Sequence, residues 1–174
     1  MYVRVNATNA EIEELERLTT LLIKERQNLE RPNYSGDGFI WPLEERFQKI
    51  TDHFGWTTSF GGRNHGGTDI GNAGINGASI YAIQSGTVIR AVESSSNSGY
   101  GSHVIIDHGG GVASLYSHMI FGSVTVSERQ DVVVGQVIGK VGSTGFSTGP
   151  HLHFEIHVNG VRVNPMGFNY TFMY

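Results

Sequence analysis

The stretch TGPHLHFEIHV, residues 148–158, has the alternation of a β-strand whose two faces differ in chemistry. Successive side chains of a strand point to opposite faces, so every second residue shares a face. One face carries Leu152, Phe154, Ile156 and Val158, and the other carries His151, His153, Glu155 and His157. The apolar face is typical of a sheet packed on a core. Three imidazoles on the opposite face suggest a functional site.

The sequence around this stretch predicts a mainly β domain of antiparallel sheet over residues 43–174. From about Ile50 onward, short β-branched runs are separated by glycines, and no helical pattern lies between them. We expect two strands within residues 79–92, a hairpin turning at residues 109–111, short strands within 131–142 and a hairpin through Asn159–Gly160. Short strands without intervening helices favour antiparallel pairing.

The N-terminal part predicts a helix and a linker. Thr8 and Glu11 have the spacing of a capping box, and leucines recur seven apart at Leu15, Leu22 and Leu29. This pattern predicts an amphipathic helix within residues 1–30, either the stub of a coiled coil or a helix packed on its own domain. Proline, glycine and serine in residues 31–42 indicate a linker, and residues 43–52 predict a second short helix.

Composition excludes several classes of function. A net charge of −4 and a pI near 6.0 argue against a nucleic-acid binder with a basic surface. The sequence contains no run of 18 apolar residues, so no membrane span is predicted, and no signal peptide is expected at the N-terminus. The absence of cysteine restricts any metal site to nitrogen and oxygen ligands and suits an exported protein.

Five residues have spacings that suggest a metal site. His65 precedes Asp69 by four positions, and two intervening glycines disfavour a helix, so both side chains share one face of an extended chain. His151 and His153 share a face in the same way, and His118 follows the first hairpin. A catalytic zinc site has three protein ligands. Two histidines and one aspartate would supply them and leave two histidines for chemistry.

The remaining histidines predict no catalytic role. His53, His103 and His157 are expected at the surface, and His108, beside a turn, is expected to be structural.

The combined motifs resemble the lysostaphin-type (LytM-type) zinc metalloendopeptidases of bacterial cell walls. The resemblance spans about residues 50–166 and rests on HGGTDI, VIIDHGGGVASLYSHM, GQVIGKVGSTG and STGPHLHFEI. It implies that His65, Asp69 and His153 bind one zinc ion. It also implies that His118 and His151 are the catalytic residues, which assist a zinc-activated water.

The same resemblance implies the substrate, the partners and an extracytoplasmic location: periplasm, cell wall or secreted. The expected activity is a peptidoglycan hydrolase that cleaves peptide cross-links, either D-alanyl bonds of stem peptides or glycine-rich bridges. The alternative is a non-catalytic LytM-like protein that binds and activates a cell-wall amidase. The helix could bind a partner or mediate self-association. A biotinyl- or lipoyl-type carrier is disfavoured, because Lys140 lacks flanking methionines and the histidines would have no role.

Overall fold

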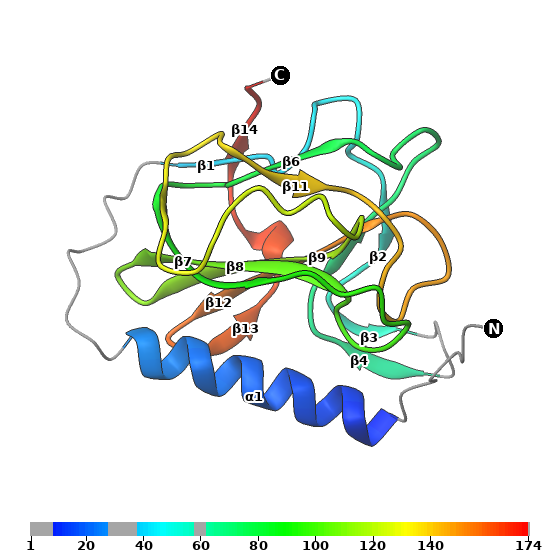
Figure 1. The fold of residues 1–174 in the computed structure, drawn as a ribbon, viewed down its shortest axis with the longest axis horizontal. Helices are drawn as coiled ribbons and strands as arrows, with labels where there is room; N and C mark the ends of the chain where they lie inside the picture. The colour runs from blue at the N-terminus through cyan, green and yellow to red at the C-terminus, as the bar shows by residue number, and fades with distance from the viewer. Residues whose placement is uncertain (1–8, 28–37, 58–61, 174) are drawn as a thin grey trace.

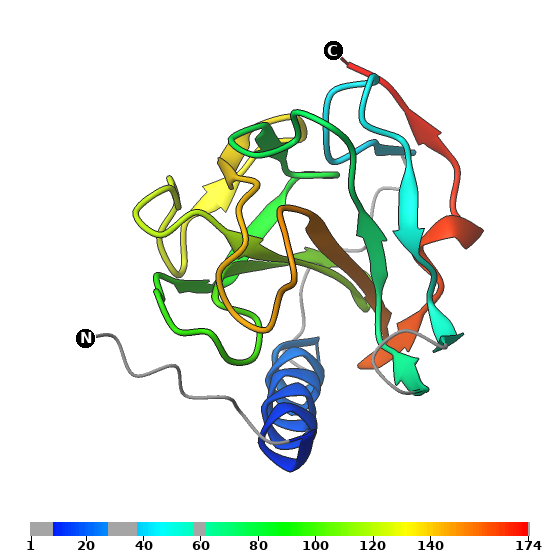
Figure 2. The same cartoon turned by 90° about the vertical axis from the view of Figure 1, so that its right-hand side faces the viewer.

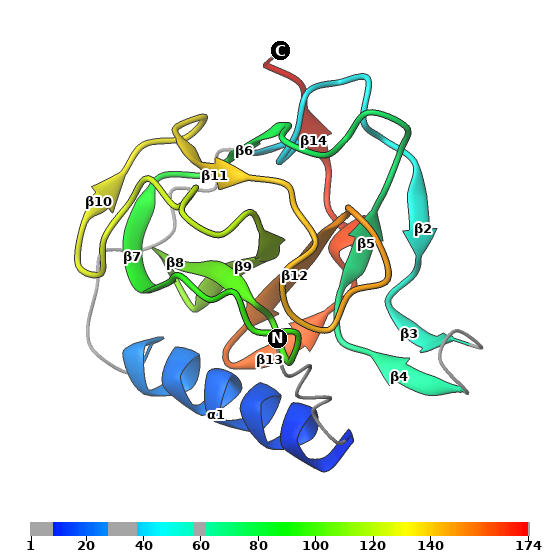
Figure 3. The same ribbon diagram turned by 45° about the vertical axis from the view of Figure 1, so that its right-hand side comes forward.

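The computed structural model describes residues 9–27, 38–57 and 62–173 of the chain. A central antiparallel sheet has the strand order β10-β7-β8-β9-β12-β5-β2, and β13 pairs with β12 beside it (Figure 3). Its strands are β2 (Ile50–Asp52), β5 (Thr68–Ile70), β7 (Gly86–Val92), β8 (Ser102–Gly109), β9 (Val112–Met119), β10 (Asp131–Val132), β12 (Leu152–Val158) and β13 (Val161–Val163). The mainly β, antiparallel fold predicted from the sequence is therefore confirmed, including both hairpins.

Three small two-stranded sheets complete the β structure. They pair β3 (Gly55–Thr57) with β4 (Arg63–His65), β6 (Ser79–Tyr81) with β11 (Val137–Lys140), and β1 (Phe39–Ile40) with β14 (Tyr170–Thr171). A 3-10 turn, η2 (Pro165–Gly167), precedes β14. The β1–β14 pair is parallel, unlike the other pairings. It brings the start and the end of the β domain together (Figure 1).

The main core lies on one face of the central sheet. Leu152, Phe154 and Ile156 of β12 are fully buried there, as the alternation predicted. They pack with residues of the small sheets, among them Ile80 and Ile138. Each fully buried side chain of this size contributes about 1.5–3 kcal/mol of hydrophobic stabilisation. This core holds β12 and β5 in place beside each other.

Helix α1 (Asn9–Gln27) covers the other face of the sheet (Figures 1 and 2). Ile23 is fully buried in a second apolar cluster with Ile105, Ala113 and Leu115 of β8 and β9. Of the two arrangements predicted for the helix, the structure has the one in which it packs on its own domain. Three leucines of α1 remain exposed: Leu15, Leu18 and Leu21. Among the described residues, no helix has the length and apolarity that a membrane crossing requires.

Two surface predictions are wrong because the histidine-bearing face of the sheet is also covered. His157 is 0% exposed and His103 is 7% exposed. Strand alternation tells which side chains share a face, but not that a helix packs over that face. His53 is exposed, as predicted, and His108 is buried between the backbone of Ser85 and the side chain of Ser114.

The predicted linker and second helix also differ from the structure. Residues 28–37 and Thr8 lie outside the described residues, but Phe39 and Trp41 belong to the core. The linker therefore does not extend to residue 42. Residues 43–49 form turns rather than a helix, and residues 50–52 form β2. The indole of Trp41 donates a hydrogen bond to the carbonyl of Phe47, so tertiary packing determines this segment.

Candidate metal centre

Three side chains from separate strands converge on one point. They are His65 at the end of β4, Asp69 in β5 and His153 in β12, and all three are buried. Oδ1 of Asp69 lies 2.7 Å from Nδ1 of His153 and 3.2 Å from Nε2 of His65. The two imidazole nitrogens are 3.0 Å apart. Zinc takes nitrogen and carboxylate ligands at about 2.0–2.2 Å, so one ion could contact all three atoms.

Backbone geometry places the three side chains together. Asp69 and His153 are direct partners in the antiparallel pair of β5 and β12. His65 is joined to Asp69 through Gly66, Gly67 and Thr68. A Cβ on Gly67 would lie 2.5 Å from the carbonyl oxygen of Phe154 and 2.9 Å from Cε1 of His153. The spacing of His65 and Asp69 therefore requires glycine at position 67, because the chain passes directly against β12.

The second nitrogen of each histidine is held by an acceptor. Nδ1 of His65 lies 3.0 Å from the carbonyl oxygen of His53, to which it donates. Nε2 of His153 lies 3.0 Å from Oε1 of Glu155. These contacts leave Nε2 of His65 and Nδ1 of His153 directed at Asp69. Such outer partners fix ring orientation and tautomer in metal sites, and the two-nitrogen, one-oxygen set fits zinc.

The electrostatics of the cluster favour a charged aspartate. Burial alone would raise the pKa of Asp69, but hydrogen bonds from His153 and His65 hold it well below its usual range. Burial lowers the pKa of His153, but hydrogen bonds to Asp69 and Glu155 outweigh this effect and raise the pKa to about 10, so without a cation the ring is protonated on both nitrogens. An ionised carboxylate is the form that ligates a cation.

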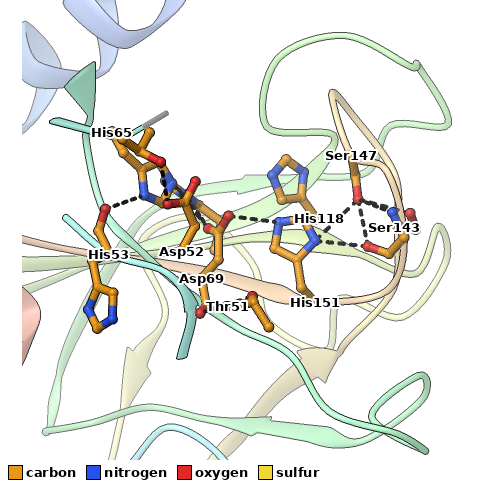
Figure 4. A network of polar contacts seen from close by, with 12 residues as sticks. Thr51, Asp52, His53, His65, Asp69, His118, Ser143, Ser147 and His151 are labelled. Atoms are coloured by element: carbon orange, nitrogen blue, oxygen red, sulfur yellow. Dashed lines mark hydrogen bonds and ion pairs between the residues drawn. The ribbon is translucent and has the colours of Figure 1, made fainter. Parts of the chain in front are cut away.

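His118 and His151 lie beside Asp69 (Figure 4). Their ring centroids are 4.7 Å apart, and the centroid of His118 is 5.8 Å from that of His153. Nδ1 of His118 donates to the carbonyl of Thr144 at 2.8 Å, and Nδ1 of His151 donates to the carbonyl of Gly149 at 2.8 Å. In a neutral ring this arrangement places the lone pair on Nε2. Nε2 of His151 lies 3.6 Å from Oδ2 of Asp69.

His118 has two further features that are common at functional sites. Its φ of 60° lies in the left-handed region, which costs energy for a residue other than glycine. Burial, and then the proximity of His151, hold its pKa well below the usual value for histidine. The imidazole is therefore neutral at neutral pH and can accept a proton.

All five predicted residues line one pocket of about 600 Å³. This volume is within the range of small-molecule and peptide-binding clefts. The wall also includes Tyr100, Phe146 and, from helix α1, Leu15 and Glu16. The sequence predicted none of these four. Helical periodicity gave no signal that α1 packs near His153, since the contact joins segments far apart in the chain.

The fold is that of the lysostaphin-type peptidases. The catalytic domain of lysostaphin from Staphylococcus simulans superposes with a TM-score of 0.58 and 32% identity, covering 70% of this chain and 91% of that domain. A zinc containing peptidase from Vibrio cholerae has a TM-score of 0.66 and 30% identity, covering 77% of this chain and 41% of that one. The profile of Peptidase family M23 matches residues 63–165, and the chain belongs to this family.

Sequence relatives carry two kinds of name. DD-carboxypeptidase/endopeptidase Mpg of Neisseria meningitidis is 45% identical over 92 residues, which is 49% of this chain and 21% of that protein. Murein hydrolase activator NlpD of Escherichia coli is 39% identical over 128 residues, which is 74% of this chain and 30% of that protein. The matched part of the chain thus spans less than a third of the length of either relative.

Proposed function

We propose that this protein is a zinc-dependent endopeptidase that cleaves peptide cross-links of peptidoglycan outside the cytoplasm. The observation that carries the proposal is the convergence of His65, Asp69 and His153, with His118 and His151 beside them. Buried, mutually oriented histidines that line a pocket are typical of a hydrolytic site. Membership of Peptidase family M23 supports the same reaction class.

His65, Asp69 and His153 hold the zinc ion in this proposal. When bound, zinc polarises a carbonyl and lowers the pKa of water to about 7, which supplies a nucleophile at neutral pH. Asp69 contributes the negative charge of the site. The acceptors behind His65 and His153 keep the coordinating nitrogens unprotonated toward the ion.

His118 and His151 move protons in this proposal. Both Nδ1 atoms donate to backbone carbonyls, so each Nε2 is available as an acceptor. A neutral His118 takes a proton from the attacking water, and the same pair can deliver a proton to the leaving amine. In their protonated form, the imidazoles also stabilise negative charge on the former carbonyl oxygen. Positioned proton transfer contributes about 10²–10⁴-fold to the rate.

Similarity supports a peptidoglycan substrate. The relative named DD-carboxypeptidase/endopeptidase suggests D-alanyl bonds of stem peptides, and the lysostaphin domain leaves glycine-rich bridges as the second possibility. An extracytoplasmic location follows from this substrate.

The alternative function is binding: activation of a cell-wall amidase without catalysis. The observation that favours it is the similarity to a murein hydrolase activator over 74% of the chain. The convergent ligand set favours the peptidase, since a binding module has no need of three buried zinc ligands with two proton-accepting histidines beside them.

Digestion of purified peptidoglycan tests the proposal. Sacculi with direct cross-links and sacculi with glycine bridges are incubated with zinc-loaded protein, and the released fragments are identified by mass spectrometry. The peptidase proposal expects new peptide termini at one type of cross-link, and none with His151→Ala. Intact cross-links in both substrates, together with faster cleavage by an added amidase, would establish the activator instead.

A further inference from the structure

Glu155 is a buried carboxylate whose acceptor positions are all used. Its Oε1 atom accepts from the hydroxyl of Tyr100 at 2.8 Å and faces Nε2 of His153 at 3.0 Å. Its Oε2 atom faces Nε2 of His157 at 2.7 Å and pairs with Nε of Arg162 at 3.5 Å. An ionised carboxylate offers about four lone-pair sites, and three hydrogen bonds and one longer ion pair fill them here.

This saturation determines how Glu155 acts on His153. A carboxylate without a proton can only accept, so the hydrogen on His153 must be on Nε2. Nδ1 faces Asp69 and His65, so a cation that replaces the proton on Nδ1 meets this nitrogen in the orientation required of a metal ligand. The neighbouring His157 has its Nδ1 buried without a partner, so its hydrogen is also on the side of Glu155. Glu155 thus sets the tautomers of two imidazoles.

Arg162 connects this carboxylate to helix α1. Its guanidinium pairs with Glu155 at 3.5 Å and donates to Oε2 of Glu16 at 3.0 Å. It also occupies the space where a Cβ on Gly66 would lie, in the turn between His65 and Asp69. Arg162 therefore contacts Glu155 behind His153, the turn between His65 and Asp69, and helix α1.

We propose that Glu155 is a positioning residue for the metal ligand His153, and that Arg162 and Glu16 extend this support to helix α1. The inference rests on the proposed zinc site. In this arrangement α1 is part of the metal centre's support, because Glu16 balances the charge of the arginine that holds Glu155. Partners of this kind typically contribute 10–100-fold to metal affinity.

The zinc dissociation constant tests the proposal without reference to catalysis. It is measured on the full chain by competition with a chromophoric chelator, and the melting temperature is measured in excess chelator. Glu155→Gln should weaken zinc binding about 10–100-fold. Glu16→Gln should weaken it about two- to fivefold, the size expected of a partly exposed ion pair. Should Glu155→Gln not fold, Arg162→Lys replaces it, with a several-fold weakening expected.

Two matched controls separate positioning from general stability. Asp107→Asn removes another buried carboxylate, which accepts from the backbone of Gly109. Glu14→Gln removes an exposed acid of the same helix, which pairs with Arg17. Both should keep the wild-type zinc affinity, even if the melting temperature falls. A wild-type affinity in Glu155→Gln, or in Arg162→Lys if that variant carries the test, would overturn the proposal.

The remaining outcomes are equally decisive. Weak zinc binding in Glu155→Gln with unchanged binding in Glu16→Gln would remove the helix from the support. Equal losses of zinc affinity in Glu16→Gln and Glu14→Gln would also remove the helix from the support, because the effect would then come from the net charge of the helix. Failure of the wild-type protein to bind zinc would instead refute the proposed function, which is a distinguishable result.

Discussion

Asp69 and His153 are direct cross-strand partners, and Oδ1 of the aspartate lies 2.7 Å from Nδ1 of the histidine. The two residues are 84 positions apart in the sequence. Their separation is set by the hydrogen-bond register of β5 and β12, which the core on one face and α1 on the other hold in place. Two of the three proposed ligands are therefore preorganised by rigid strands.

Loss of the central carboxylate should abolish metal retention. Asp69→Asn keeps the shape of the side chain but removes its charge, so zinc affinity should fall by at least about 100-fold. Metal content after dialysis, measured by mass spectrometry, checks this, and activity should fall in parallel. Asp131→Asn is the control, since this exposed acid accepts from the hydroxyl of Thr87 and does not line the pocket. Full zinc content in Asp69→Asn would contradict the ligand assignment.

The two adjacent histidines should be separable from the metal. His118→Asn is preferable to alanine because asparagine tolerates the left-handed backbone at this position. Both His118→Asn and His151→Ala should retain zinc while turnover falls about 10²–10⁴-fold. Zinc content and the release of peptide termini are measured on the same preparations. Near wild-type turnover in both variants would refute their proton-transfer roles.

The glycine turn between the first two ligands should not tolerate a methyl group. Gly67→Ala would press Cβ against the carbonyl of Phe154, so we expect a loss of about 1–3 kcal/mol in unfolding free energy and weaker zinc binding. Gly167→Ala is the control, because its Cβ would meet nothing within 4 Å. Urea unfolding of both variants measures the difference. Equal stability of the two would show that the backbone can shift.

Acid should destabilise the protein partly through His108. Burial lowers the pKa of His108 to about 4 from its ordinary value of 6.5. The unfolded chain therefore takes up this proton near pH 6.5, whereas the folded protein does so only near pH 4. A stabilisation of about 3 kcal/mol, present above pH 6.5, is lost as the pH falls to 4.

His108→Gln removes this titration. Its unfolding free energy should be lower at neutral pH, because contacts with Ser85 and Ser114 are weakened. That free energy should fall less steeply than the wild-type value between pH 6.5 and 4. Denaturant unfolding at several pH values measures both slopes. Parallel curves for the two proteins would exclude His108 as a source of the acid sensitivity.

Helix packing makes a prediction of its own. Ile23 is fully buried against the sheet, so Ile23→Ala should cost about 2–5 kcal/mol, or release α1 locally from the sheet. Leu21→Ala changes a side chain that is 47% exposed and should have little effect. Hydrogen exchange of α1 amides distinguishes local release from global loss of stability. Identical exchange in both variants would mean that the burial of Ile23 contributes little.

The sequence predicted the strands well because their signals are local. The hairpin of β12 and β13 is specified by alternation and by Asn159–Gly160, both of which lie within the element itself. The grouping of site residues could also be predicted, since even spacing along extended chain places His65 with Asp69. The roles of these residues remain predictions.

Features that depend on distant packing could not be predicted. His157 was predicted at the surface because nothing in its strand indicates that a helix covers it. Trp41 was assigned to the linker because glycine and proline lie close to it in the sequence. The contacts that link His153 through Glu155 and Arg162 to Glu16 include one between residues 146 positions apart. The sequence indicated one part of this arrangement, because strand alternation places Glu155 on the same face as His153 and His157.

The tautomers of His118 and His151 are both fixed by main-chain oxygens, at Thr144 and Gly149. Every amino acid supplies that oxygen, so changing the side chain at either position does not by itself remove the acceptor. The course of the loop backbone, rather than the identity of its side chains, thus determines that Nδ1 carries the hydrogen in both imidazoles. Such a pair can persist through sequence drift in the loop, provided that insertions and deletions do not move its backbone.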